Sequence, residues 1–85
     1  MTYEIQIKPR ALKQLSKIDN KQKNRILLKI NDLSNDPYSA NTKSLKGKDD
    51  RSMRVGDYRV IYDVFNDKLV VLVLVIGHRK EVYKL

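Results

Sequence analysis

The sequence predicts an α+β domain in which a helical hairpin packs on one face of a single, mainly antiparallel sheet. Three patterns predict it: residues 2–8 alternate between apolar and polar side chains, residues 9–33 carry apolar positions at helical spacing, and residues 51–76 form blocks of high β-propensity separated by short turns. The expected order is an N-terminal strand, an antiparallel helical hairpin and a three-stranded antiparallel meander. We expect one domain over residues 1–85, because a chain of this length supports a single core.

The first half of the chain supplies the strand and both helices. After the strand at residues 2–8, Pro9 suits the first turn of a short helix. Its apolar stripe is expected to consist of Leu12, Leu15 and Ile18. Asp19 and Asn20 favour a helix cap. The second helix that follows is expected to have one face made of Lys23, Ile26, Leu27, Ile30 and Leu33.

Residues 38–50 separate the helices from the meander. Pro37 ends the second helix, and the composition then turns to Ser, Asn, Thr, Lys, Gly and Asp, which predicts a connection rather than a regular element. Its lysines are flexible point charges that could reach phosphates near the end of the sheet; they are Lys43, Lys46 and Lys48.

The meander is expected to have three strands joined by tight turns. Gly56-Asp57 and Asn66-Asp67 have the composition of two-residue hairpin turns. The run from Leu69 to Ile76 is apolar throughout, which favours a central strand buried on both faces. A polar tail from His78 to Tyr83 follows Gly77.

Composition limits the function. Eighteen Lys and Arg against ten Asp and Glu give a formal net charge of +8, for which the simplest partner is a polyanion such as nucleic acid. The chain has no cysteine and one histidine, so we expect neither a cofactor nor a metal. The longest apolar run is far shorter than a membrane span, and we expect a cytoplasmic protein without a membrane partner.

Three arginines of the meander are the candidate functional residues. Strand alternation places Arg59 opposite Tyr58 and Val60, with Arg54 on the neighbouring strand and Arg79 just after Gly77. Converging guanidiniums bind phosphate bidentately and stabilise the charge of a phosphorane transition state. The alternative for any one of these arginines is that it is a solvated or ion-paired surface residue. In that case Asp57 or Asp63 would form the ion pair with Arg59.

A nuclease would need a further group for proton transfer, because a guanidinium does not release its proton. Tyr83 and His78 are candidates, since cations lower a tyrosine pKa and histidine starts near neutrality. Glu81 is a third candidate for proton transfer. Alternatively, His78 is only an exposed residue of the tail, and Tyr83 only anchors the tail against the sheet.

The run from Leu45 to Tyr83, with LKG, MRVGDYRVIYDV and VLVLVIGHRKEVY, resembles the toxins of the RelE and ParE superfamily of toxin–antitoxin pairs. ALKQLSKI in the helical hairpin also fits, so the resemblance spans nearly the whole chain. The RelE branch cleaves messenger RNA in the ribosomal A site without a metal. The resemblance therefore implies a ribosome-dependent endoribonuclease that inhibits translation and is neutralised by a cognate antitoxin in a hetero-oligomer.

Carried over by motif, the resemblance implies that Arg59, Arg79, Tyr83 and Arg54 are catalytic. Residues expected to contact RNA are Lys43, Lys46, Lys48, Arg51, His78 and Lys80. The sequence departs from the RelE pattern at Ser52, where the ribonuclease has a lysine thought to act in proton transfer. Lys46, Lys48, His78 or a deprotonated Tyr83 would have to replace it, and some related toxins use a glutamate with a C-terminal histidine and tyrosine.

Two other functions stay open at this point. The first is a ParE-like toxin that inhibits DNA gyrase by protein binding, against which the retained arginines and Tyr83 argue. The second is an inactive RNA-binding domain, which predicts no effect on growth.

Overall fold

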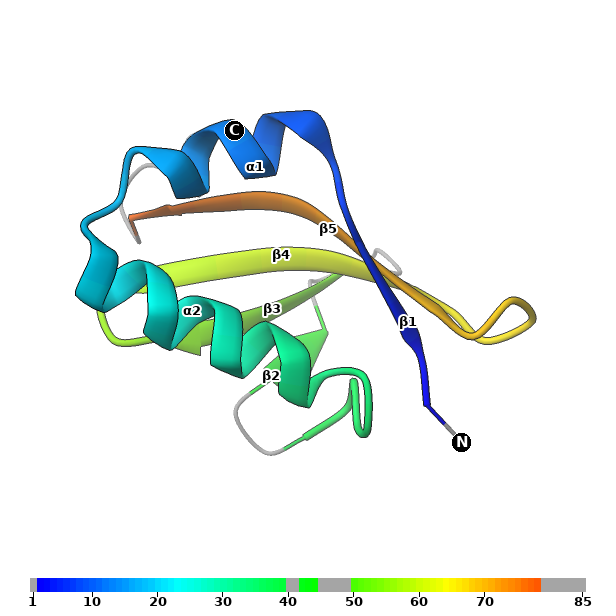
Figure 1. Ribbon diagram of the computed structural model, residues 1–85. Coiled ribbons are helices and arrows are strands. Elements are labelled where there is room, and N and C mark those ends of the chain that lie inside the picture. The colour runs from blue at the N-terminus through cyan, green and yellow to red at the C-terminus, as the bar shows by residue number, and fades with distance from the viewer. Residues whose placement is uncertain (1, 40–41, 45–49, 79–85) are drawn as a thin grey trace.

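The structure is a computed structural model that describes residues 2–39, 42–44 and 50–78. Figure 1 shows two helices packed against one sheet. In chain order the elements are β1 (Glu4–Ile7), α1 (Pro9–Ser16), α2 (Asn20–Asp32), β2 (Thr42–Ser44), β3 (Arg51–Val55), β4 (Tyr58–Phe65) and β5 (Val70–His78). The α+β class and the order of strand, two helices and meander are confirmed.

The five strands form one sheet in the order β1-β5-β4-β3-β2. β1 pairs in parallel with β5, and every other neighbouring pair is antiparallel. The sheet is therefore mixed, as a mainly antiparallel sheet with one parallel edge strand. A parallel pair requires a long connection between its strands, and here both helices and three strands separate β1 from β5 in the sequence.

The segment predicted as a plain connection contains a strand. β2 has only three residues, and Thr42, Lys43 and Ser44 pair with Met53, Ser52 and Arg51 of β3. Three residues are too few to display an alternation that distinguishes a strand from a loop. The neighbouring strand decides the conformation here, and the prediction of a connection was wrong for these residues.

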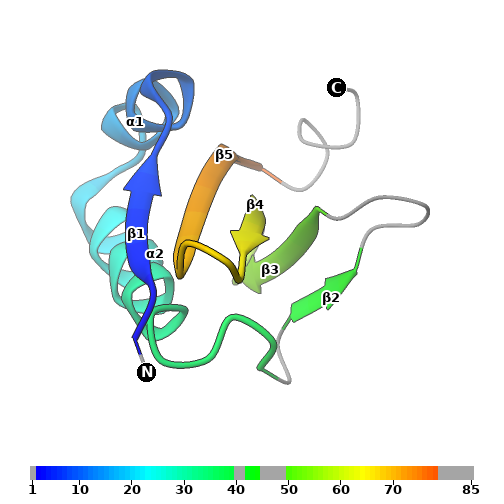
Figure 2. The same ribbon diagram turned by 90° about the vertical axis from the view of Figure 1, so that its right-hand side faces the viewer.

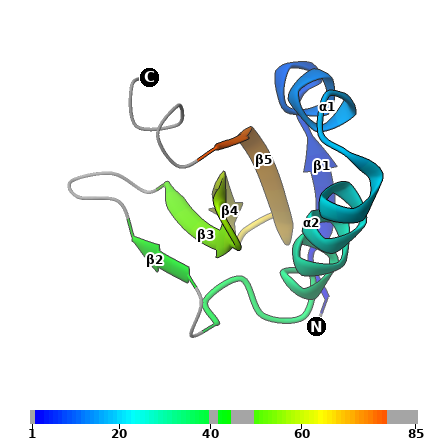
Figure 3. The same cartoon turned by 90° about the vertical axis from the view of Figure 1, so that its left-hand side faces the viewer.

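Both helices lie on the same side of the sheet, as the two side views show (Figures 2 and 3). We call this side the near face and the opposite side the far face. α1 lies over β5, and α2 lies over the middle of the sheet. Pro9 opens α1 as predicted, and the Asp19 side chain caps α2 by accepting a hydrogen bond from Gln22 N at 3.3 Å. Among the described residues, no helix is long and apolar enough to cross a membrane.

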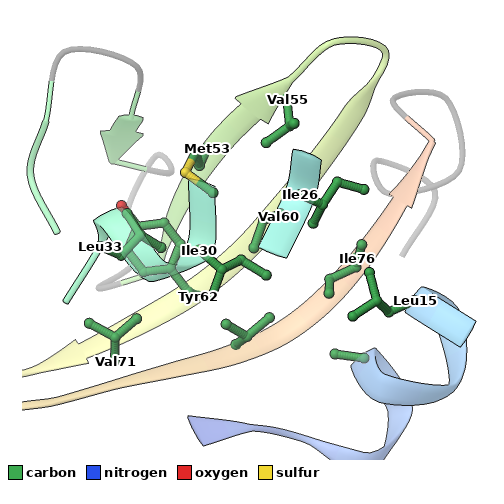
Figure 4. Close-up of a cluster of buried hydrophobic side chains, with 12 residues drawn as sticks. Leu15, Ile26, Ile30, Leu33, Met53, Val55, Val60, Tyr62, Val71 and Ile76 are labelled. Carbon is green, nitrogen blue, oxygen red and sulfur yellow. The ribbon is translucent and has the colours of Figure 1, made fainter. Parts of the chain in front are cut away.

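The core fills the space between the helices and the near face (Figure 4). The predicted α1 stripe was wrong in one member, because Leu12 is 51% exposed and Ala11 is buried in its place beside Leu15. Leu27 of α2 is also exposed, at 38%. The Tyr62 hydroxyl donates a hydrogen bond of 2.6 Å to the Pro37 carbonyl, which ties the end of the helical region to the sheet. The remaining core residues are Ile26, Ile30, Leu33, Met53, Val55, Val60, Val71, Val73 and Ile76.

The central strand is β4, not the apolar run that became β5. β5 is an interior strand, yet on the far face its side chains are half-buried instead of fully buried.

The Gly56-Asp57 turn is confirmed, with Gly56 at φ +59°. The second turn is longer than predicted, because it spans residues 66–69 and places Leu69 at φ +53°. Glu4 N donates to the Leu69 carbonyl at 2.7 Å, which helps to hold this unusual conformation.

Candidate functional site

Two arginines lie side by side on the far face. Arg54 of β3 is the direct cross-strand partner of Arg59 of β4. Side chains directly opposite each other in an antiparallel pair have Cβ atoms about 4.5–5.5 Å apart, and like charges there are destabilising. The pair therefore costs stability as it stands, and an anion placed between the two guanidiniums would remove the repulsion.

Arg59 is the more deeply placed of the two. Only 8% of its surface is exposed, and its Nε atom has no hydrogen-bond partner in the part of the chain that the structure describes. Its partner on the other side is Gly77 of β5, which has no side chain to compete for the space beside the guanidinium. A buried guanidinium nitrogen without a hydrogen-bond partner is unfavourable, so this position is suited to binding an anion.

Arg54 is exposed at the end of the β3–β4 hairpin. Its Nε donates to the Gly56 carbonyl at 3.3 Å, and the positive φ of Gly56 shapes the turn that bears this carbonyl. Arg54 is exposed, so its terminal nitrogens can bind a second oxygen of an anion held at Arg59. Planar guanidiniums are well suited to two-point contacts with phosphate.

Lys43 and Ser52 extend the arginine pair toward the sheet edge. Ser52 shares the far face with Arg54 on β3, and Lys43 of β2 is the cross-strand partner of Ser52. Lys43 is exposed, whereas Ser52 is 3% exposed. Sequence reasoning named Lys43 and Ser52 but did not predict that they pair, because β2 was not predicted and the register between β2 and β3 was unknown.

Arg51 does not belong to this group. It shares a face with Met53, and its guanidinium donates to Thr42 Oγ1 at 3.0 Å and lies 4.9 Å from the centre of the Tyr38 ring. Tyr38 in turn exchanges hydrogen bonds with Asn66 in the β4–β5 turn. Arg51 therefore fastens the segment before β2 to the sheet, and this placement lends no support to the predicted contact with RNA.

His78 also lies away from the arginine pair. Its cross-strand partner is Tyr58, and the two rings meet edge to face with centres 5.8 Å apart. Both side chains line a cleft of about 510 Å³ beside α1, together with Lys17 and Ile18. Because Tyr58 and Arg59 are adjacent on one strand, this cleft opens on the opposite side of the sheet from Arg59.

The other predicted site residues fall outside the described part of the chain. These residues are Lys46, Lys48, Arg79, Lys80 and Tyr83, together with the alternative base Glu81. Their roles stay predictions. What the structure brings together from the predicted set is Arg54, Arg59 and Lys43 on one face.

Comparison with known proteins places this chain in a family. Residues 5–83 match the sequence model of a family described as the ParE toxin of the type II toxin–antitoxin system, parDE. The whole chain aligns at 26% identity with 94% of an Escherichia coli protein whose name describes it as a RelE-like toxin.

Solved structures agree with this assignment. A chain of the archaeal RelE–RelB complex from Pyrococcus horikoshii OT3 is 29% identical, with a TM-score of 0.84 over 93% of this chain and 97% of that chain. An Escherichia coli RelE toxin mutant in the free state is also 29% identical, with a TM-score of 0.83 over 99% of this chain and 93% of that chain.

Proposed function

This chain belongs to the ParE toxin family of type II toxin–antitoxin systems and is a RelE-like toxin, and we propose that it is a ribosome-dependent endoribonuclease that cleaves messenger RNA in the A site. The observation that carries the proposal is the cross-strand pair of Arg54 and Arg59 on the far face. Two adjacent cations, one of them buried, suit a phosphodiester and the additional negative charge of its transition state.

The proposed reaction is an internal transfer of the phosphoryl group. The 2′-hydroxyl of a nucleotide attacks its own 3′-phosphate, and the bond from phosphorus to the 5′-oxygen of the next nucleotide breaks. The products are a 2′,3′-cyclic phosphate and a free 5′-hydroxyl. Arg59 and Arg54 would hold the non-bridging oxygens and offset the charge that develops on them, while Arg79 and Tyr83 complete the site as the resemblance implies.

Dependence on the ribosome follows from the limited chemistry of such a site. Arginines bind and polarise the phosphate but do not transfer protons, so a large share of the rate must come from holding the 2′-oxygen in line with the leaving group. A scaffold that already presents the message in one conformation supplies that alignment. The net charge of +8 adds salt-dependent affinity for ribosomal RNA.

The proposed partner in the resting cell is a cognate antitoxin. The solved relative from Pyrococcus horikoshii is a RelE–RelB complex. For this chain we propose a hetero-oligomer in which an antitoxin with acidic segments covers the far face, because an acidic segment would neutralise Arg54, Arg59 and Lys43 together.

Induction in a bacterial host tests the activity. Wild-type protein should arrest growth and produce new 5′ ends within translated messages, seen by primer extension. Arg59→Ala and Tyr83→Ala should abolish both effects, while Lys21→Ala, which removes an exposed lysine of α2, should leave them unchanged. Full toxicity of both the Arg59 and Tyr83 variants would contradict the proposal.

Inhibition of DNA gyrase is the second candidate, because the matching family is named for ParE. A supercoiling assay with purified gyrase separates the two functions. Inhibition of supercoiling without message cleavage would establish the gyrase function in place of the nuclease. A chain that only binds RNA would change neither growth nor either assay.

A further inference from the structure

We propose that Lys43 is the proton donor to the 5′-oxygen that leaves during RNA cleavage, an inference that rests on the proposed nuclease function. The arginine pair cannot supply this proton, because a guanidinium stays protonated in proteins. A lysine ammonium is a positive group that can release a proton and regain it from solvent. The question is whether the fold brings such a group to the arginine pair.

The register between β2 and β3 shows which face of the sheet the Lys43 side chain points to. Thr42 pairs with the core residue Met53, and its hydroxyl accepts the hydrogen bond from Arg51 on the near-face side. Successive side chains of a strand point to opposite faces. Lys43 therefore points to the far face, the same side as Ser52, Arg54 and Arg59.

The register also sets the distance between Lys43 and the arginine pair. Lys43 is directly opposite Ser52 and diagonal to Arg54, and diagonal cross-strand neighbours lie about 7–8 Å apart. A lysine side chain with its four-carbon stem spans such a gap. Ser52 is small, so β3 carries no bulky side chain between Lys43 and the position where Arg54 and Arg59 would hold a phosphate.

Two titratable rivals among the described residues are less well placed. His78 faces the helices and packs against Tyr58, on the other side of the sheet from Arg59. Asp63 shares the far face, but it lies four positions along β4 from Arg59, which at about 3.3 Å per residue is about 13 Å away. Lys43 combines the right face with proximity to Arg54.

The proton balance of the step is simple. The 2′-oxygen forms its bond to phosphorus and releases its proton to water. The bond from phosphorus to the 5′-oxygen breaks with its electron pair on that oxygen, which takes a proton from Lys43 Nζ. The neutral amine is then protonated again by solvent. Proton transfer of this kind contributes about 100- to 10,000-fold to a rate.

The test is single-turnover cleavage of a message positioned in the A site of purified ribosomes, at saturating protein. Lys43→Ala and Lys43→Arg should each lower the rate about 100-fold, because arginine keeps the charge but does not release its proton. Lys21→Ala serves as the control for loss of one exposed positive charge. A Lys43→Arg variant with the wild-type rate would overturn the inference.

A modified substrate separates proton donation from binding. Replacing the 5′-bridging oxygen at the cleavage site by sulfur yields a leaving group that needs no proton. Lys43→Ala should cleave this substrate within about threefold of the wild-type rate, whereas the Arg59→Ala defect should persist. An equal Lys43→Ala defect on both substrates would show a role in binding alone. If wild-type protein cleaves neither substrate on ribosomes, the nuclease function itself fails, and the inference fails with it.

Relocation of the amine adds an independent check. The double variant Lys43→Ala/Ser52→Lys moves the ammonium to the directly opposite position on β3. It should recover at least tenfold of the rate lost in Lys43→Ala. Thermal unfolding of each variant establishes that it is folded, and a folded double variant as slow as Lys43→Ala would count against the inference.

Discussion

On β4, Val60 and Tyr62 face the helices and are fully buried among apolar neighbours. Arg59 faces the other way and is almost as buried, and its Nε atom has no hydrogen-bond partner among the described residues. The same strand therefore carries two kinds of burial. Burial on the near face stabilises the fold, since it removes apolar surface from water. Burial on the far face is unfavourable on its own, which is the pattern expected where a site is prepared for a ligand.

Truncation of a core residue on the near face should give the largest loss of stability. Ile26 of α2 is fully buried against the sheet, and Ile26→Ala should lower the free energy of unfolding by about 2–5 kcal/mol. Urea denaturation measures the change. Leu28→Ala on the same helix is the matched control, because Leu28 is 68% exposed and its truncation should cost about 0.5 kcal/mol or less.

Replacement of Arg59 on the far face should lower activity without lowering stability. Arg59→Met should lower cleavage by about 100- to 1,000-fold, as loss of a group that stabilises transition-state charge does. The free energy of unfolding should stay the same or rise, because the substitution removes a buried cation opposite Arg54. The two readouts are cleavage on ribosomes and urea denaturation. A large loss of stability would instead identify Arg59 as a structural residue.

The buried polar contact of the near face should give an intermediate effect. Tyr62→Phe keeps the ring but removes the hydroxyl that donates to the Pro37 carbonyl at 2.6 Å. The carbonyl then loses its partner, at a cost of about 1–3 kcal/mol. Differential scanning calorimetry should show a lower melting temperature with cleavage unchanged at temperatures where the variant is folded. An unchanged melting temperature would mean that water replaces the hydroxyl.

Arg51 and Arg54 form a pair of arginines three residues apart on opposite faces, and they should give the smallest effects. Arg54→Ala should reduce the salt slope of RNA binding by about one phosphate contact. Arg51→Ala should leave the slope unchanged and destabilise the fold by about 0.5–1 kcal/mol through loss of its contact with Tyr38. A reduced slope for Arg51→Ala would restore its predicted role in RNA binding.

Much of the fold followed from local pattern. The Pro9 and Asp19 signals and the Gly56-Asp57 turn placed the helix starts and the first hairpin correctly, since each depends on residues close in the chain. The alternation along β4 likewise predicted the face of Arg59, because the period of a strand is local. The family resemblance added Arg79 and Tyr83, whose roles remain predictions.

Other features depended on contacts between distant segments. β2 exists because β3 offers it hydrogen bonds, and the same pairing sets Lys43 against Ser52. β4 rather than β5 became the central strand, because the order of strands reflects how β1 and β2 add to the two edges. Periodicity therefore placed most of the buried apolar residues, with Leu12 and Leu27 as exceptions. The register between strands decided which charges share a face, because pairing partners are chosen by the folded sheet and not by neighbours in the chain.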